Sequence, residues 1–173
     1  GDILDAELAF WKHRLGDLSV LELPTDMPRP PVWSGKGARK VKLLPEELIS
    51  KLKSFSAQIS ATPFMTMLTA FYLLLWRYTG QEDIAAGVPI ANRTRRETEN
   101  IVGTFVNTLV IRSDLSGDPS VIELIERVRS EALVAFEHQD LPFEKLVEEL
   151  QPERDLSYAP LIQVLFNVQN APA

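Results

Sequence analysis

Apolar residues recur at intervals of three and four, or form a stripe along one face, at residues 4–15, 45–60 and 120–137, which is the pattern of an amphipathic helix. The predicted helices cover residues 4–15, 45–60, 62–78, 120–137 and 142–150. The third begins with Thr62-Pro63, an N-cap followed by a proline that the first turn accepts, and it ends at Gly80. Because apolar side chains surround almost all of this helix, we expect it to be central and buried, or covered by a second lobe or subunit.

Other stretches have the composition of strands. β-Branched and apolar residues predict strands at residues 83–90, 104–112 and 161–168, and alternating basic and apolar residues predict a short one at 38–43. The strand at 161–168 is almost continuously apolar, so we expect it at the sheet centre. Prolines between Pro24 and Pro31 predict an extended connector. Strands interleaved with helices indicate an α/β fold, a layered sandwich in which helices cover a mixed sheet.

Composition narrows the possible functions. The length of 173 residues suits one domain, and the formal net charge of −6 argues against nonspecific binding to nucleic acid or to an anionic membrane. The absence of cysteine excludes disulfides, thiol catalysis and thiolate metal sites, and two distant histidines make a zinc site unexpected. No signal peptide is visible and the longest apolar stretch is too short to span a bilayer, so we expect a cytoplasmic protein without membrane contact.

Three short motifs follow one another in fixed order, at residues 101–112 (Ile-Val-Gly-Thr-Phe-Val-Asn-Thr-Leu-Val-Ile-Arg), 138–144 (His-Gln-Asp-Leu-Pro-Phe-Glu) and 154–161 (Arg-Asp-Leu-Ser-Tyr-Ala-Pro-Leu). They resemble the three later motifs of the condensation domains of nonribosomal peptide synthetases. The resemblance covers nearly the whole chain and is most specific between Val88 and Arg112. It implies that residues 1–173 are most of the C-terminal lobe of such a domain, with a fold similar to chloramphenicol acetyltransferase.

The resemblance also implies a reaction and its partners. In this family two lobes enclose a tunnel, and donor and acceptor peptidyl carrier proteins bring thioesters on phosphopantetheine arms to its two ends. Peptide bond formation, no directly bound cofactor, an N-terminal lobe of the same domain and an adjacent adenylation domain are therefore expected. The family's catalytic signature, His-His-x-x-x-Asp-Gly, is not in this sequence. We therefore expect no catalytic residue here, and an inactive chain when it is isolated from the first lobe.

Asn107 is the unusual residue of the first motif, because asparagine is disfavoured in strands and a buried amide needs hydrogen-bond partners. The residues themselves leave open whether it serves a site or bonds to local backbone. The family places this strand beside the substrate tunnel, which favours Asn107, Gly103 and Phe105 as tunnel residues.

Arginines in the polar loop at 91–100 can simply be solvated, or one can reach across a cleft to a carboxylate. In the family, an arginine of this lobe holds the aspartate of the catalytic signature. Arg93 follows the preceding strand as the family's arginine does, so it is the first candidate for an inter-lobe contact. Arg112 is the second.

The second and third motifs favour structural roles. His138 lies at a predicted helix end, where a protonated imidazole suits the helix dipole, and Asp140 can cap the helix that Pro142 starts. Arg154 and Asp155 precede the last predicted strand, where they can bond in a turn or, for Arg154, contact a carrier protein or the other lobe.

Two alternatives stay open from the sequence. The chain can be a noncatalytic lobe that docks a carrier protein through an exposed apolar face. It can also belong to an epimerisation or heterocyclisation domain, although the forms of the first two motifs look closer to ordinary condensation domains.

Overall fold

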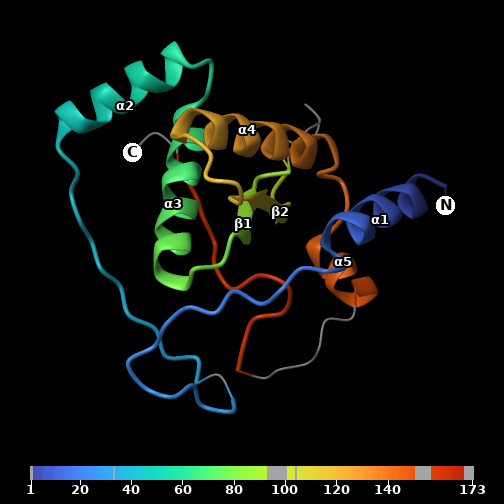
Figure 1. The fold of residues 1–173 in the computed structure, drawn as a ribbon. Coiled ribbons are helices and arrows are strands. Elements are labelled where there is room, and N and C mark those ends of the chain that lie inside the picture. Colours follow the sequence, from blue (N-terminus) through green and yellow to red (C-terminus); the bar gives the residue numbers. More distant parts are fainter. Residues whose placement is uncertain (1, 33, 93–100, 104, 151–156, 170–173) are drawn as a thin grey trace.

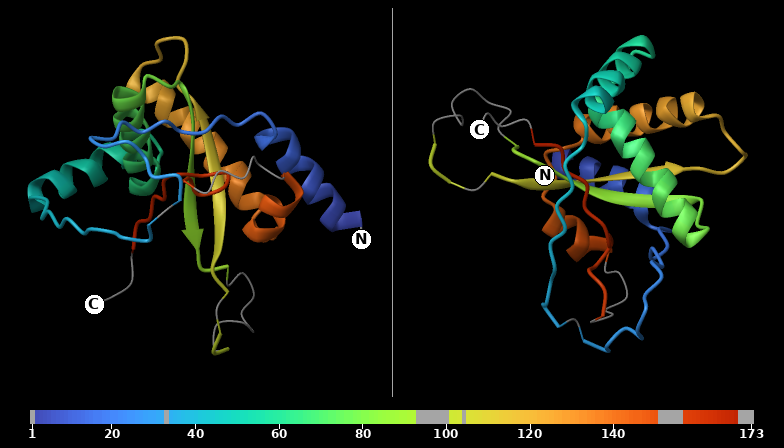
Figure 2. Two further views of the ribbon diagram at one scale, coloured as in Figure 1. Left: turned by 90° about the horizontal axis from the view of Figure 1, so that it is seen from below. Right: turned by 90° about the vertical axis from the view of Figure 1, so that its left-hand side faces the viewer.

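A computed structural model of the chain describes residues 2–32, 34–92, 101–103, 105–150 and 157–169. Its elements, in chain order, are α1 (Asp2–Leu15), α2 (Glu46–Gln58), α3 (Pro63–Thr79), β1 (Asp83–Ile90), β2 (Asn107–Asp114), α4 (Val121–Glu137) and α5 (Phe143–Leu150). Figure 1 shows β1 and β2 in the centre, α3 and α4 packed on each other and on the strands, α1 beside α5, and α2 projecting from α3. The expected α/β architecture is confirmed. Figure 2 shows the same arrangement from two further directions.

The bounds of α3 follow from its caps. The Thr62 hydroxyl accepts a hydrogen bond from the Met65 N–H at 3.2 Å, and Gly80 has a φ of 71°, a left-handed conformation that favours glycine. The inner face is buried, and the Tyr72 hydroxyl donates to the Ile111 carbonyl of β2 at 2.6 Å. The outer face is not buried, since Leu74, Trp76 and Tyr78 are exposed. The prediction of a central helix is therefore confirmed for one face only.

The strand β1 makes backbone hydrogen bonds on both of its edges. It pairs antiparallel with β2, with Gly87 opposite Val110. On its other edge the Gly87 N–H donates to the Val164 carbonyl at 3.0 Å, and the Phe166 N–H donates to the Gly87 carbonyl at 2.8 Å. A single parallel bridge, between Gly87 and Leu165, results. Flanked on both edges, β1 has five consecutive buried residues, Ile84–Val88.

Two strand predictions are wrong. Residues 161–168 form one bridge at the sheet edge rather than a central strand, because their apolar side chains pack on α3 instead of between strands. Phe166 contacts Phe64 and Phe71 of that helix, with ring centroids 5.8 and 5.4 Å apart. Residues 38–43 form no strand, since no partner strand lies beside them in the part of the chain that is described. The strand expected at 104–112 lies at Asn107–Asp114.

The helix α4 begins with the capping box that the sequence indicates. The Ser120 hydroxyl accepts a hydrogen bond from the Glu123 N–H, and the Glu123 carboxylate accepts one from the Ser120 N–H. Replacing Ser120 with alanine is expected to lower the free energy of unfolding by about 1 kcal/mol, because one N–H of the first turn loses its acceptor. Urea denaturation measures the change, and an unaltered midpoint would contradict it.

Candidate functional site

Asn107 fills all four hydrogen-bonding positions of its amide. Its Nδ2 donates to the carbonyls of Gln139, at 2.9 Å, and Leu141, at 2.8 Å. Its Oδ1 accepts from the N–H of Phe143, the first residue of α5, at 3.0 Å, and from its own neighbour Thr108 at 2.8 Å. The side chain is buried. Asn107 therefore fastens β2 to the connection between α4 and α5. The backbone groups of this connection provide hydrogen-bond partners that a buried amide requires.

A small hollow adjoins this amide. It has a volume of about 250 Å³ and is lined by residues from the end of the sheet and the start of α5, namely Asn92, Phe105, Val106, Asn107, Pro142 and Glu144. Two of the residues expected along a substrate tunnel, Phe105 and Asn107, thus lie together, and Gly103 is exposed nearby in the sequence. Asp140 is exposed in the turn before α5, whose first N–H is already bonded by Asn107.

Arg112 is engaged within the chain. Its Nε and Nη2 hold the Asp83 carboxylate at 2.8 and 2.6 Å, and its Nη1 donates to Asp17 and to the Arg14 carbonyl, each at 2.6 Å. These contacts join β1, β2 and the end of α1. The hydrogen bonds to Asp83 and then Asp17 raise the pKa of the guanidinium, so it carries its charge at every relevant pH. Four of its five N–H groups are used inside this chain.

The Arg112 cluster predicts a pH dependence. Replacing Arg112 with glutamine is expected to raise the pKa of Asp17, because the hydrogen bond from Arg112 is the main reason that this pKa is low. A carboxyl group whose pKa is lowered by folding stabilises the fold at pH values above its pKa in the unfolded chain, about 3.9. This stabilisation is lost as the pH falls through its pKa in the folded protein.

The variant should therefore be less stable than the wild type at neutral pH, and the difference in the free energy of unfolding should shrink as the pH falls below about 4. Carbon NMR titration of Asp17 and urea denaturation at several pH values measure both effects. A difference in stability that grew on acidification would contradict the assignment.

His138 lies where α1 meets the end of α4. Its ring stacks on Phe10, with centroids 3.6 Å apart, and its Nδ1 lies 3.0 Å from the Glu7 carboxylate. Its carbonyl accepts a hydrogen bond from the Trp11 indole at 3.1 Å. His138 thus contacts three residues of α1, and its structural role stays a prediction.

Arg93, Arg154 and Asp155 lie outside the described residues. Among the described residues no group of three His, Cys, Asp or Glu side chains could hold a metal ion. In the same part of the chain, no single helix is long and apolar enough to cross a membrane, although α2 and α3, bent by 104°, pass that test as a pair.

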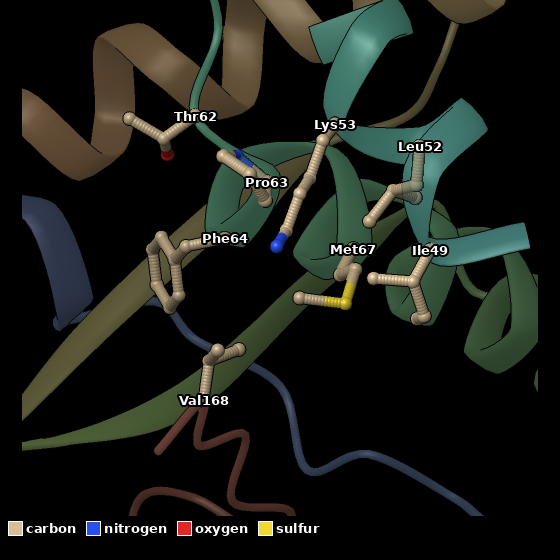
Figure 3. Close-up of a pocket in the computed structure, with 8 residues that line it drawn as sticks. All are labelled: Ile49, Leu52, Lys53, Thr62, Pro63, Phe64, Met67 and Val168. Atoms are coloured by element: carbon tan, nitrogen blue, oxygen red, sulfur yellow. The ribbon is translucent and has the colours of Figure 1, made fainter. Parts of the chain in front are cut away.

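A second pocket lies between α2, α3 and the end of the described chain. Its volume is about 300 Å³, and apolar side chains dominate its lining of Ile49, Leu52, Lys53, Thr62, Pro63, Phe64, Met67 and Val168. In Figure 3 the amino group of Lys53 points into this space, opposite Phe64 and Val168. Sequence reasoning did not mark this pocket, because each residue is also an ordinary member of a helix face.

A model of condensation domains matches residues 2–173 of this chain. The chain belongs to the condensation-domain family. One of the subunits of the linear gramicidin synthase of Brevibacillus parabrevis is 53% identical over 173 residues, which are 99% of this chain and 2% of that protein. The chain therefore spans only a small part of the synthetases that it matches.

Solved structures agree with this assignment. A four-domain nonribosomal peptide synthetase, holo-AB3403 bound to AMP and glycine, matches with a TM-score of 0.93 and 31% identity over 96% of this chain and 13% of the other. The X-domain from teicoplanin biosynthesis, solved in complex with OxyB, matches with a TM-score of 0.85 and 27% identity over 92% and 35%. The condensation-domain fold, with its chloramphenicol acetyltransferase-like lobe, is thereby confirmed.

Proposed function

We propose that this chain is the greater part of one lobe of a condensation domain that forms a peptide bond between two thioester substrates carried by partner proteins. The observation that carries the proposal is the family match over residues 2–173, together with identities near one half to peptide synthetases. The proposed partners are the N-terminal lobe, donor and acceptor carrier proteins with phosphopantetheine arms, and an adenylation domain.

The reaction constrains what this lobe contributes. The acceptor amine nitrogen bonds to the donor thioester carbon, the carbon–sulfur bond breaks, and the amine proton passes through a base to the released thiol. Neither histidine of this chain suits that base: His138 is packed on α1, and His13 lies on the exposed side of α1. The proposed role is to hold amine and thioester together and exclude water, with the base in the first lobe.

The positions of particular residues support the proposed role of this lobe. Phe105 and Asn107 line the hollow beside α5, and we assign them with Gly103 to the tunnel wall. Arg93 remains the proposed inter-lobe arginine. Arg112 is a weaker candidate for that contact, because its donors are used by Asp83, Asp17 and Arg14.

The test compares the isolated chain with the intact condensation domain, each supplied with two thioester-loaded carrier proteins. Mass spectrometry of the carrier-bound product should show condensation for the intact domain and none for the isolated chain. Product formation by the isolated chain would overturn the assignment of the base to the first lobe. In the intact domain, Arg93→Ala should reduce turnover, and unchanged folding and turnover would remove its proposed role.

A second candidate function is a lobe that docks another protein without chemistry. The neighbour that favours it is the teicoplanin X-domain, whose solved complex contains OxyB. The same assay separates the two functions, because a docking lobe would bind loaded carrier proteins while the intact domain formed no product.

A further inference from the structure

Asn107 borders the hollow at the start of α5, but its amide has no hydrogen-bonding position left for a substrate. The two hydrogens of its Nδ2 go to the carbonyls of Gln139 and Leu141. Its Oδ1 accepts from two backbone N–H groups, those of Thr108 and Phe143. An amide has two donors and one oxygen with two lone pairs, and these four bonds use them all. Another residue must therefore bind any charged group that enters the hollow.

Glu144 brings a negative charge to this hollow. Apart from Asn107, the other described residues that line it are an uncharged amide and three apolar side chains, namely Asn92, Phe105, Val106 and Pro142. Its volume of about 250 Å³ lies just below the range of about 300–1,000 Å³ that is typical of sites for drug-sized ligands. A small hollow with apolar walls and a carboxylate suits the amino end of a small ligand, because an ammonium group donates charge-assisted hydrogen bonds to a carboxylate.

Hydrogen bonds fix the backbone on both sides of Glu144. The N–H of Phe143 donates to the Oδ1 of Asn107 at 3.0 Å. The N–H of Lys145 donates to the Pro142 carbonyl, also at 3.0 Å. The side chain of Glu144 therefore starts from a backbone position that β2 and the first turn of α5 both define.

Lys145, the cation next to Glu144 in the sequence, is engaged with other carboxylates. Its Nζ lies 3.0 Å from the Glu148 carboxylate and 3.3 Å from that of Glu149, both further along α5. Glu144 itself is exposed at the start of this helix. Lys145 thus forms its ion pairs away from the hollow, and the negative charge of Glu144 remains at the hollow.

We propose that the Glu144 carboxylate binds the α-amino group of the acceptor substrate. The proposal rests on the proposed function, because it takes the hollow to be part of the tunnel wall. The acceptor is the partner whose reacting group is an amine, whereas the reacting carbon of the donor thioester offers a carboxylate nothing to bind. Glu144 contributes binding and orientation, and no bond is made or broken at this residue.

The test measures the binding of two small probes to the intact condensation domain, so it requires no turnover. The first is glycyl-aminopantetheine, in which an amide N–H replaces the thioester sulfur of an acceptor. The second is the propionyl analogue, which has a methyl group where the first has its amino group. Ligand-observed NMR titration gives the Kd of each probe for the wild type, Glu144→Gln, Glu144→Asp and Glu148→Gln. Glu148→Gln is the matched control, because Glu148 is also exposed on α5 but does not line the hollow.

Glu144→Gln should weaken the binding of the glycyl probe about fivefold, at the upper end of what an exposed ion pair provides, and leave the propionyl probe unaffected. Glu144→Asp keeps the charge on a shorter side chain, so it should weaken the glycyl probe less than Glu144→Gln does. Glu148→Gln should match the wild type with both probes. All variants should keep the circular dichroism of the wild type, because neither glutamate is part of the core.

Equal weakening of both probes by Glu144→Gln would show that Glu144 acts through another part of the protein, and it would overturn the proposal. So would an unchanged affinity of this variant for the glycyl probe, the same loss in Glu148→Gln, or no binding of the glycyl probe to the wild type. The condensation assay separates these failures from failure of the proposed function. If the intact domain forms product, the proposed function stands although Glu144 has lost its assigned role.

Discussion

Replacing Asn107 with aspartate is expected to lower the free energy of unfolding by about 3 to 4 kcal/mol. The change removes both N–H donors of the amide and sets a carboxylate oxygen against the carbonyls of Gln139 and Leu141, at a residue that is only 7% exposed. Two lost hydrogen bonds of about 1 kcal/mol each, and the two carbonyls that lose these donors, account for that magnitude. Urea denaturation followed by circular dichroism measures it.

A matched control separates this effect from the added charge. Asn92→Asp makes the same chemical change at a half-buried residue lining the same hollow, and it should alter stability by less than about 0.5 kcal/mol. If Asn107→Asp were as mild as this control, the four hydrogen bonds of Asn107 would not be fastening β2 to the connection between α4 and α5.

Replacing Gly87 with valine should detach residues 161–168 from the sheet, at a cost of about 2 to 3 kcal/mol. A Cβ at this position would lie 2.2 Å from Ile162 Cδ1 and 2.6 Å from Leu165 Cδ2, well inside van der Waals contact. Alanine should cost less, because both clashing atoms are ends of side chains that can turn away. Amide hydrogen exchange at Phe166, whose N–H donates to the Gly87 carbonyl, reports detachment directly.

The readout distinguishes detachment from general loss of structure. Exchange should quicken at Phe166 while the amides between β1 and β2 stay protected. Gly37→Val is the control, because a Cβ there meets nothing within 4 Å. If the exchange rate of the Phe166 amide were unchanged in Gly87→Val, the close approach of residues 161–168 to β1 would not depend on the absence of a side chain at residue 87.

The helices could be predicted because their signals are local. Thr62 and Gly80 mark the ends of α3, and Ser120 with Glu123 marks the start of α4, each within four residues of the bond it makes. A cap or an amphipathic face is complete in one stretch of sequence, so the pattern alone is sufficient.

Strand pairing depended on information that no single stretch contains. Residues 38–43 have the alternation of a strand, yet without a partner they remain an exposed extended segment. Residues 161–168 are apolar enough for the centre of a sheet. They lie at its edge instead, where Phe166 packs on the aromatic side chains of α3. Composition indicates that a segment can be a strand, whereas its place in a sheet is decided by what lies beside it.

The candidate site shows the same difference between features set by local sequence and features set by distant residues. The sequence singles out Asn107 as a polar residue in a strand, but its partners lie more than thirty residues away in a turn whose path no local pattern gives. The sequence makes Arg112 a candidate for a contact between lobes. The spacing of residues along the chain does not identify Asp83 and Asp17 as its partners.

The contact between Asn107 and the first turn of α5 also bears on the persistence of this short helix. The eight residues of α5 are too few for a helix to persist alone in water. Its first N–H is bonded from β2, 36 residues earlier in the chain. We therefore expect α5 to be stable only while the Asn107 side chain of β2 is in place, and to fray early when the sheet is weakened.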